Sequence, residues 1–206
     1  MKIDLSVVIT EEILKSILKL GSDKQIPPVA QFGHIGTHFD IMDKTFSLDN
    51  TERTGKLFDV SHVKNRAVAV GDIDAASIQE LDFVMFYTGF LKERGYGKPD
   101  YFANHPELSD ELIACLVGKK VSLIGIDAPG IRQPAEHPKA DQYCADNGIF
   151  VIENLANLDA VAREAGSAAF LVHTYPVNYK GLSGLPCRVI AETAGMPLSS
   201  ASVYEK

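Results

Sequence analysis

Two apolar runs near the middle of the chain constrain its fold most strongly. Val121–Ile126 and Ile149–Ile152 are dominated by aliphatic and aromatic residues and lack the polar and apolar alternation of a half-exposed strand. Such runs are typical of strands buried on both faces, as in a sheet that helices cover. Segments with helical spacing of apolar residues separate runs of this kind, so the sequence predicts an α/β fold.

Shorter patterns complete the expected order of elements. Thr10 is a typical helix N-cap, and apolar residues recur at helical spacing from Ile13 to Leu20, with Gly21 as the expected stop. The other expected helices are Ser109–Leu116 and Leu158–Ala165. The other expected strands are Lys2–Ile9, Ala67–Val70, Phe83–Thr88, Ala168–His173 and Arg188–Ala191. The long turn-rich segments, where site loops are typical, are Gly21–Gly36, Asp40–Thr54 and Ala128–Ala140.

The length and composition fit one domain without a membrane span. The chain has 206 residues, with no break in composition and no internal repeat, so we expect a single domain over residues 1–206. No stretch approaches the roughly 20 apolar residues that a membrane span needs, and the N-terminal segment lacks the features of a secretory signal. The three cysteines form no short-spaced pair, which favours reduced thiols and a cytoplasmic location.

The charge of the chain argues against nucleic-acid binding. Lys and Arg number 20 and Asp and Glu number 27, which gives a net charge of −7 at pH 7. Neutralising phosphates requires a basic surface, and the sequence contains no basic run. It also contains no phosphate-binding loop and no Gly-x-Ser-x-Gly nucleophile motif. We therefore expect no nucleic-acid partner and no membrane partner.

The densest group of possible metal ligands is the segment His34–Asp40, which reads His-Ile-Gly-Thr-His-Phe-Asp. Two imidazoles and one carboxylate are ligands that zinc or manganese accepts. Gly36 disfavours a helix, so we expect a loop that enters a short strand. On a strand His38 and Asp40 point to the same side, and a turn at Gly36 would let His34 join them. The alternative is a polar turn with two hydrogen-bonded histidines.

Other residues could take part in the same chemistry. Glu153 ends the second apolar run, where a carboxylate is costly unless it is paired, protonated or bound to a metal; a helix cap or a salt bridge explains it as well. Residues 136–141 include His137 and Asp141 as possible ligands or proton carriers, or form a charged surface loop. Lys44 lies four residues beyond the histidine segment and is either an electrostatic or proton-transfer group or a solvated lysine.

The histidine segment resembles the His-x-Gly-Thr-His-x-Asp signature of the cyclase family of metal-dependent hydrolases, to which bacterial kynurenine formamidase and isatin hydrolase belong. Other segments resemble further parts of that family in the same order along the chain. They are Asp4–Ser6, Tyr101–Ser109, Gly125–Pro129, Ile152–Leu158 with its Glu-Asn-Leu motif, and Gly184–Ala191. Together these matches cover nearly the whole chain, and the chain is identified as a divergent member.

The resemblance implies a fold and an assembly. The fold would be a compact α/β single domain with a central mixed, partly barrel-like β-structure flanked by helices, of the swivelling β/β/α type. The assembly would be a homodimer or a homotetramer. The resemblance also implies one or two divalent metal ions, either zinc or manganese.

The resemblance further implies a ligand set. By position, His34, His38 and Asp40 would be ligands, and Glu153 would supply a further carboxylate. In the family a histidine precedes that glutamate by about a dozen residues. Counting back without a gap reaches Asp141, which we prefer slightly because a carboxylate can ligate the same ions. A longer loop would bring in His137 instead.

The chain departs from the family at its site. Met42 and Lys44 stand where the family has a proline and a histidine, and that histidine is thought to act in proton transfer. Gly130 and Arg132 stand where the family often has a serine and an aspartate. These differences put a formamidase activity in doubt more than they do metal binding.

The expected function is a metal-dependent, arylformamidase-like hydrolysis of a small-molecule amide or lactam by metal-activated water. Lys44 and His137 are the expected catalytic residues. Lys44 could transfer a proton only with a strongly lowered pKa, and otherwise it would stabilise developing negative charge. The alternatives are a non-catalytic small-molecule or metal-binding protein on the same fold, and a purely structural metal.

Overall fold

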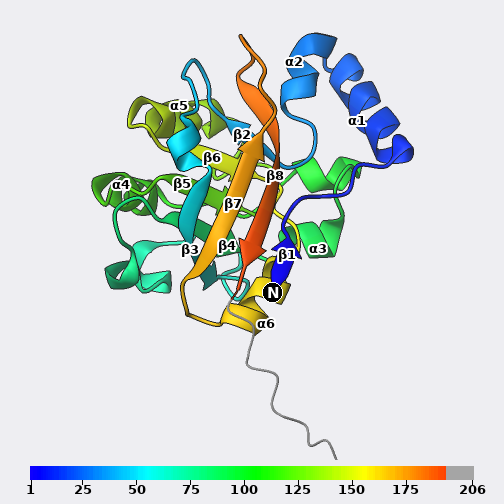
Figure 1. Cartoon of the computed structure of the whole chain (residues 1–206). Coiled ribbons are helices and arrows are strands. Elements are labelled where there is room, and N and C mark those ends of the chain that lie inside the picture. The colour runs from blue at the N-terminus through cyan, green and yellow to red at the C-terminus, as the bar shows by residue number, and fades with distance from the viewer. Residues whose placement is uncertain (194–206) are drawn as a thin grey trace, which may run out of the picture.

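The computed structural model describes residues 1–193 of the 206-residue chain (Figure 1). The strands are β1 (Lys2–Asp4), β2 (His38–Asp40), β3 (Glu52–Asp59), β4 (Phe83–Tyr87), β5 (Leu123–Ile126), β6 (Phe150–Glu153), β7 (Phe170–Pro176) and β8 (Gly184–Glu192). The α-helices are α1 (Glu11–Asp23), α2 (Pro28–Gly33), α3 (Phe90–Arg94), α4 (Asp110–Gly118), α5 (His137–Asp146) and α6 (Leu158–Ala165). Short 3-10 helices are η1 (Leu48–Asn50), η2 (Val70–Asp72), η3 (Ala75–Ser77) and η4 (Pro99–Phe102).

The described strands form one sheet that closes on itself. Their order is β1-β8-β2-β6-β5-β4-β3-β7, and β7 also pairs with β8. Seven strands therefore make a closed barrel, and β1 is attached to it through β8 alone. The strands from β3 to β6 pair in parallel, whereas β2, β7 and β8 pair with their neighbours in antiparallel fashion. The expected mixed, barrel-like α/β fold is confirmed.

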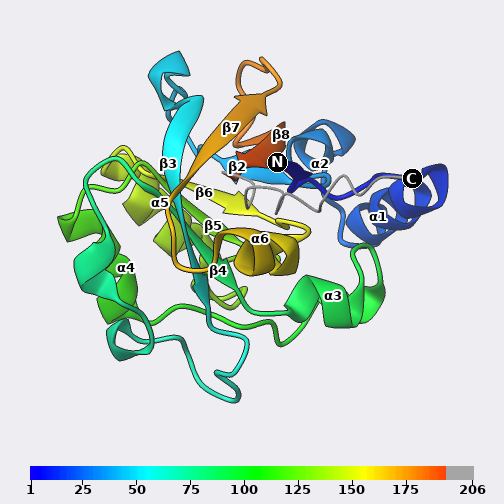
Figure 2. The same cartoon turned by 60° about the horizontal axis from the view of Figure 1, so that its bottom comes forward.

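Side-chain alternation along the strands divides the core into two clusters. The inner faces fill the barrel, with Phe39, Met85 and Val189 fully buried there. Helix α6 adds Leu158 and Val161 to this inner cluster and so covers one end of the barrel (Figure 2). The outer faces of β4, β5 and β6 pack against residues of α4 and α5 in a second cluster. The apolar runs of the sequence are thus buried on both faces, as predicted.

Several local expectations were wrong. Residues 67–70 form no strand, because Val68 makes only an isolated bridge to Leu108. Helix α1 continues past Gly21 to Asp23, and this glycine is needed for packing instead, because a Cβ there would lie 2.2 Å from the side chain of Gln31. The first strand stops at Asp4.

Helix α2 lies wholly within the expected loop segment Gly21–Gly36, and β3 and α5 begin within the other two expected loop segments and continue beyond them. Strand β3 and helix α5 are rich in polar residues, so neither shows a clear apolar period. Strand β3 is held by backbone pairing to β4 and β7 on its two sides. Helix α5 buries few residues against the sheet, and one of them is the predicted site residue Asp141.

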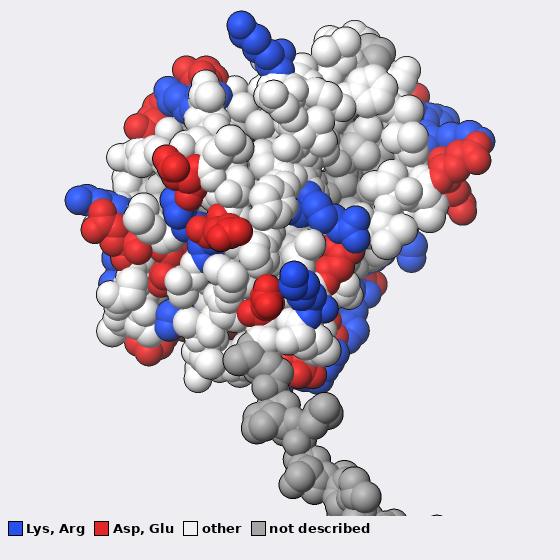
Figure 3. Space-filling view, viewed as in Figure 1, with Lys and Arg blue, Asp and Glu red and all other residues white. Residues whose placement is uncertain are grey.

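The charged surface and the helices bear on possible partners. On the face shown in Figure 3, acidic and basic side chains are interspersed, and the described part of that face carries no continuous basic patch. No helix among residues 1–193 is long and apolar enough to cross a membrane.

Candidate metal centre

Strand β2 positions two of the predicted ligands. The three-residue strand lies between β6 and β8, and its alternation turns Phe39 into the barrel and leaves His38 and Asp40 on the outer face. His38 is paired with Glu153 at the end of β6. His38 Nε2 lies 3.5 Å from Glu153 Oε2 and 3.7 Å from Asp40 Oδ1. The expected short strand with His38 and Asp40 on one side is confirmed.

His34 reaches the same place from the end of helix α2. It directly follows the helix, and Gly36 adopts a φ of +76°, which glycine tolerates, so that the chain can turn into β2. His34 Nδ1 lies 3.1 Å from Asp40 Oδ1, and its ring packs edge-on to that of His38 at 4.9 Å between centroids. The other ring nitrogen, Nε2, is 3.0 Å from Ser183 Oγ in the β7–β8 hairpin. The predicted turn at Gly36 is confirmed.

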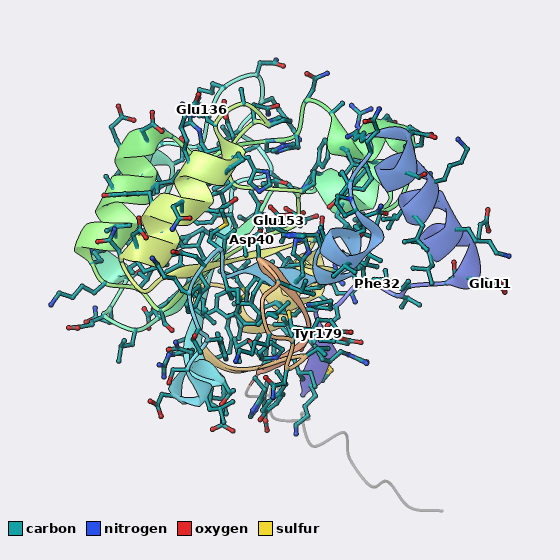
Figure 4. The ribbon with its side chains drawn as sticks, turned by 90° about the horizontal axis from the view of Figure 1, so that it is seen from above. Glu11, Phe32, Asp40, Glu136, Glu153 and Tyr179 are labelled. Carbon is teal, nitrogen blue, oxygen red and sulfur yellow. The ribbon has the colours of Figure 1, made fainter. Side chains whose placement is uncertain are left out.

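Helix α5 supplies the remaining donors. His137 and Asp141 are one helical turn apart and therefore lie on the same face. His137 Nε2 is 2.7 Å from Asp141 Oδ2 and 2.9 Å from Glu153 Oε1. The sequence left open whether His137 or Asp141 belongs to the site, and the structure places both side chains there. Figure 4 shows Asp40 and Glu153 close together near the centre of the molecule.

The donors form two groups that share one residue. His34, His38 and Asp40 each offer one atom, and these atoms lie within 4.8 Å of one another. The second group also offers one atom per residue within 4.8 Å of the others, and it consists of Asp40, His137, Asp141 and Glu153. Asp40 therefore belongs to both groups, which is the arrangement expected of a carboxylate that lies between two ion positions.

The charges in this cluster fit a divalent cation. The carboxylates of Asp40, Asp141 and Glu153 are buried, and Asp40 Oδ2 and Asp141 Oδ1 have no hydrogen-bond partner. Burial and the charge of Asp40 raise the pKa of Glu153 to about 8, and burial raises the pKa of Asp141 to about 6. Unpaired buried carboxylates are costly. A dication would offset their repulsion and use the unpartnered oxygens as ligands.

The histidines are arranged to complement these carboxylates. Burial lowers the pKa of His38, which favours the neutral imidazole that metals bind. Burial also opposes the charge of His137, but hydrogen bonds and Coulombic attraction from Asp141 and Glu153 outweigh it and raise the His137 pKa to about 11. Without a metal ion, a protonated His137 therefore neutralises part of the negative charge of the neighbouring carboxylates.

Comparison with known proteins places this architecture in a family. The model of the Cyclase family, described as "Putative cyclase", matches residues 3–133, which is more than half of the chain. This chain belongs to the Cyclase family. The match includes His34, His38 and Asp40 and ends before helix α5. No curated protein matches the chain.

Solved structures share the fold of this Cyclase-family chain. A potential metal-dependent hydrolase with cyclase activity is 23% identical, with a TM-score of 0.71 over 93% of this chain and 96% of the other. A predicted metal-dependent hydrolase from Bacillus stearothermophilus is 22% identical, with a TM-score of 0.69 over 93% and 97%. Isatin hydrolase A from Labrenzia aggregata, bound to benzyl benzoate, is 20% identical, with a TM-score of 0.65 over 77% and 73%.

The ion pairs of Lys44 in this Cyclase-family chain involve residues outside the two donor groups. Its ammonium is 2.7 Å from Asp146 Oδ1 in α5 and 3.0 Å from Asp43 Oδ1. Hydrogen bonds to Asp146 and Asp43 raise the pKa of Lys44. Proton transfer near neutral pH would require a lowered pKa. A catalytic Lys44 thus stays an untested prediction that its contacts do not favour, and the observed contacts tie the loop after β2 to α5.

The β7–β8 hairpin contributes residues that the sequence did not indicate. Ser183 accepts hydrogen bonds at its backbone oxygen from Ile41 and Met42, in addition to its contact with His34. Ser183 also lines a cavity of about 1100 Å³ between α2, the loop after β2 and the hairpin. The lining includes none of the six donor residues. The contact between residues 34 and 183 depends on the pairing of β8 with the distant strand β2, which no local sequence pattern reveals.

Gly184 is required for His34 to reach the cluster. A Cβ at this position would lie 2.6 Å from the backbone oxygen of Gly33 and 2.7 Å from the ring of His34. We expect Gly184→Ala to displace His34 from Asp40, to weaken metal binding and to cost about 1–3 kcal/mol of stability. Isothermal titration calorimetry with Mn²⁺ or Zn²⁺ and thermal unfolding measure the two effects.

A matched control for this substitution is Gly118→Ala in α4, where a Cβ would meet nothing within 4 Å. The control should leave metal affinity unchanged and leave stability unchanged or higher by about 0.4–1 kcal/mol. Equal metal affinities for Gly184→Ala and the unmodified protein would show that His34 needs no such close approach.

Proposed function

We propose that this protein is a divalent-metal-dependent hydrolase that acts on amides or lactams of small molecules. The observation that carries the proposal is the convergence of three buried carboxylates and three histidines, together with buried oxygens of Asp40 and Asp141 that have no hydrogen-bond partner. Membership of the Cyclase family and the fold shared with structures described as metal-dependent hydrolases support it.

The donor residues differ in burial, and we propose that their roles differ accordingly. Four donor side chains are at most 5% exposed and would hold the ion or ions from the buried side of the cluster. They are those of His38, Asp40, Asp141 and Glu153. His34 and His137 are 38% and 25% exposed, so the cluster is open on the side between α2 and α5. We propose that the substrate approaches from this side. A divalent ion held here supplies Lewis-acid activation of water and of the scissile carbonyl.

His137 is the proposed group for proton transfer. Its Nε2 lies between Asp141 and Glu153, so it can hold a proton beside two carboxylates at the open side of the cluster. With one ion in the group of His34, His38 and Asp40, the positive charge of the ion would lower the pKa of His137 from about 11, and His137 could give a proton to a leaving nitrogen only to the extent that this pKa falls toward neutrality. With a second ion in the other group, His137 serves as a ligand.

A substrate panel tests the proposal. The protein loaded with Mn²⁺ or Zn²⁺ would be assayed on amides, lactams, esters and lactones, with N-formylkynurenine and isatin included. We expect metal-dependent hydrolysis of at least one amide or lactam, abolished by chelation and restored by the ion. Hydrolysis that is unaffected by chelation would contradict the proposed role of the cluster.

A second candidate function is small-molecule or metal binding without turnover. It is favoured by one observation, namely that Lys44, which by the resemblance stands where the family has a histidine, is engaged with Asp43 and Asp146. This candidate predicts stoichiometric metal binding with no turnover on the whole panel. It gains support only if the metal is bound and the panel is negative.

The protonation of the cluster predicts how metal binding depends on pH. The raised pKa of Glu153, about 8, means that this carboxyl holds a proton at pH 7 when no metal is bound. A metal must displace that proton, so its binding releases at least one proton. We expect the apparent affinity to rise by about tenfold or more per pH unit from 6 to 8, and to keep rising above pH 8 where His137 is a ligand, because the ion then also displaces the His137 proton. Competition with a chelator of known affinity measures this, and an affinity that is constant from pH 6 to 8 would contradict it.

A further inference from the structure

A hydrogen-bonded chain lies behind the buried ligand His38. The carbonyl oxygen of Gly36 is 2.9 Å from His38 Nδ1 and accepts a second hydrogen bond, at 3.0 Å, from Asn154 Nδ2. A carbonyl oxygen only accepts, so the proton of a neutral His38 is on Nδ1. Nε2 then presents its lone pair toward Asp40 and Glu153, 3.7 Å and 3.5 Å away.

Tyr101 fixes the orientation of the Asn154 amide. Because Asn154 Nδ2 donates to Gly36, its Oδ1 faces the opposite way, where it lies 2.7 Å from the Tyr101 hydroxyl. That hydroxyl donates to Oδ1. The orientation is therefore determined by partners at both ends of the amide, one a donor and one an acceptor.

Hydrogen bonds also fix the backbone of Asn154. Its N–H donates to the carbonyl of Ala128, and its carbonyl accepts from Thr37 Oγ1 at 2.8 Å. The residue adopts a φ of +58°, which asparagine tolerates better than most side chains do. It directly follows Glu153, so one residue pair carries both a proposed ligand and the amide that faces the ligand His38.

The residues of this hydrogen-bonded series are buried, so that each lost hydrogen bond is costly. Tyr101 is fully buried, and Asn154 and His38 are each 2% exposed, so water is not at hand to replace a lost partner. In such an environment an unsatisfied donor or acceptor is expensive. The His38 ring consequently has one favoured tautomer and one favoured orientation as long as the hydrogen bonds that link Tyr101, Asn154 and Gly36 are intact.

We propose that Tyr101 and Asn154 are positioning residues that hold His38 in the Nδ1–H tautomer and keep Nε2 directed at the metal position. This inference deepens the proposed function and rests on it for the identity of the ligand. Groups that orient a ligating imidazole through its other nitrogen are worth about 10–100-fold in metal affinity or activity. The effect passes through Gly36 and His38, and neither positioning residue needs to touch the metal or the substrate.

Two substitutions interrupt the chain while disturbing the backbone little. Tyr101→Phe removes only the hydroxyl. Asn154→Gly removes the amide and tolerates the positive φ. The matched control is Tyr96→Phe, because the Tyr96 hydroxyl also contacts Gly36 but accepts from its N–H, at 2.6 Å, on the opposite side of the residue from the carbonyl.

The first readout is the tautomer of His38 in the metal-free protein, measured by long-range ¹H–¹⁵N NMR of ¹⁵N-histidine-labelled protein. We expect the Nδ1–H form in the unmodified protein and in Tyr96→Phe. In Tyr101→Phe and Asn154→Gly we expect the Nε2–H form to become populated. The second readout is Co²⁺ affinity with its visible absorption spectrum, where we expect a loss of about 10–100-fold and a changed spectrum in these two variants.

The outcomes separate this inference from the proposed function. If Tyr101→Phe and Asn154→Gly keep the Nδ1–H form and bind Co²⁺ within twofold of the unmodified protein, the inference is wrong. It is equally wrong if Tyr96→Phe shifts both readouts as much as Tyr101→Phe does, because the effect would then come from the Gly36 loop. If the unmodified protein binds no metal at all, the proposed function fails, whereas the NMR result still reports the tautomer.

Discussion

Asp40→Asn will abolish tight metal binding by both groups of donors. Asp40 belongs to each group, and Oδ1 lies 3.1 Å from His34 Nδ1 and 3.7 Å from His38 Nε2 while Oδ2 has no hydrogen-bond partner. The substitution removes a charged ligand, so we expect a larger loss than the ~10–100-fold typical of a change behind a ligand. Metal content per chain after loading and desalting, measured by mass spectrometry, gives the result.

The control for this prediction is Asp43→Asn, three residues further along, in the loop after β2. The Asp43 side chain is exposed and contacts Lys44 and Gln142, so its loss should leave metal content unchanged. In the metal-free state, Asp40→Asn should be somewhat less stable than the unmodified protein, because burial raises the pKa of Asp40 but attraction from His38 and His34 outweighs it and favours the ionised carboxylate in the fold. Equal metal content in the Asp40→Asn and Asp43→Asn variants would rule out Asp40 as the shared ligand.

Metal loading will raise the thermal stability of the protein. An ion that binds only the folded state contributes about 2.7 kcal/mol when it is present at 100 times its dissociation constant. For a chain of this length, each kcal/mol raises Tm by roughly 2–4 °C, so we expect an increase of about 5–10 °C. The physical source is the relief of repulsion among Asp40, Asp141 and Glu153. Differential scanning fluorimetry at fixed pH, with and without Mn²⁺ or Zn²⁺, measures the increase.

The same scan with Asp40→Asn should show no increase, and a chelator should reverse the increase in the unmodified protein. The pH has to be held near 8, because Glu153 holds a proton below its raised pKa of about 8 and the ion would compete with that proton. An equal Tm increase in the Asp40→Asn variant would mean that the stabilising ion binds elsewhere on the protein.

Local patterns predicted the parts of the site that lie on one short segment. The alternation of a strand was enough to place His38 and Asp40 on one side, and the glycine between the two histidines indicated the turn that brings in His34. The apolar runs likewise predicted the buried parallel strands β5 and β6. In each case the physical cause acts within a few residues, which is why the sequence is informative.

The other parts of the site depend on contacts between distant segments. Helix α5 carries His137 and Asp141 one turn apart, but its polar sequence gives no clear helical period. The sequence therefore predicted the two residues as alternatives, whereas the structure places His137 against both Asp141 and Glu153. The contacts of Ser183 and Gly184 with His34 depend on the pairing of β8 with the distant strand β2. Long-range pairing of this kind leaves no periodic signal in the chain.

The most direct test of the metal centre is an anomalous diffraction experiment on crystals loaded with Mn²⁺ or Zn²⁺. The account predicts an anomalous peak within about 2.0–2.2 Å of an Asp40 oxygen and of donors from at least one of the two groups. A second peak among Asp40, His137, Asp141 and Glu153 would show two ions. Full loading with no peak at Asp40, or with peaks only at surface carboxylates, would contradict the central claim.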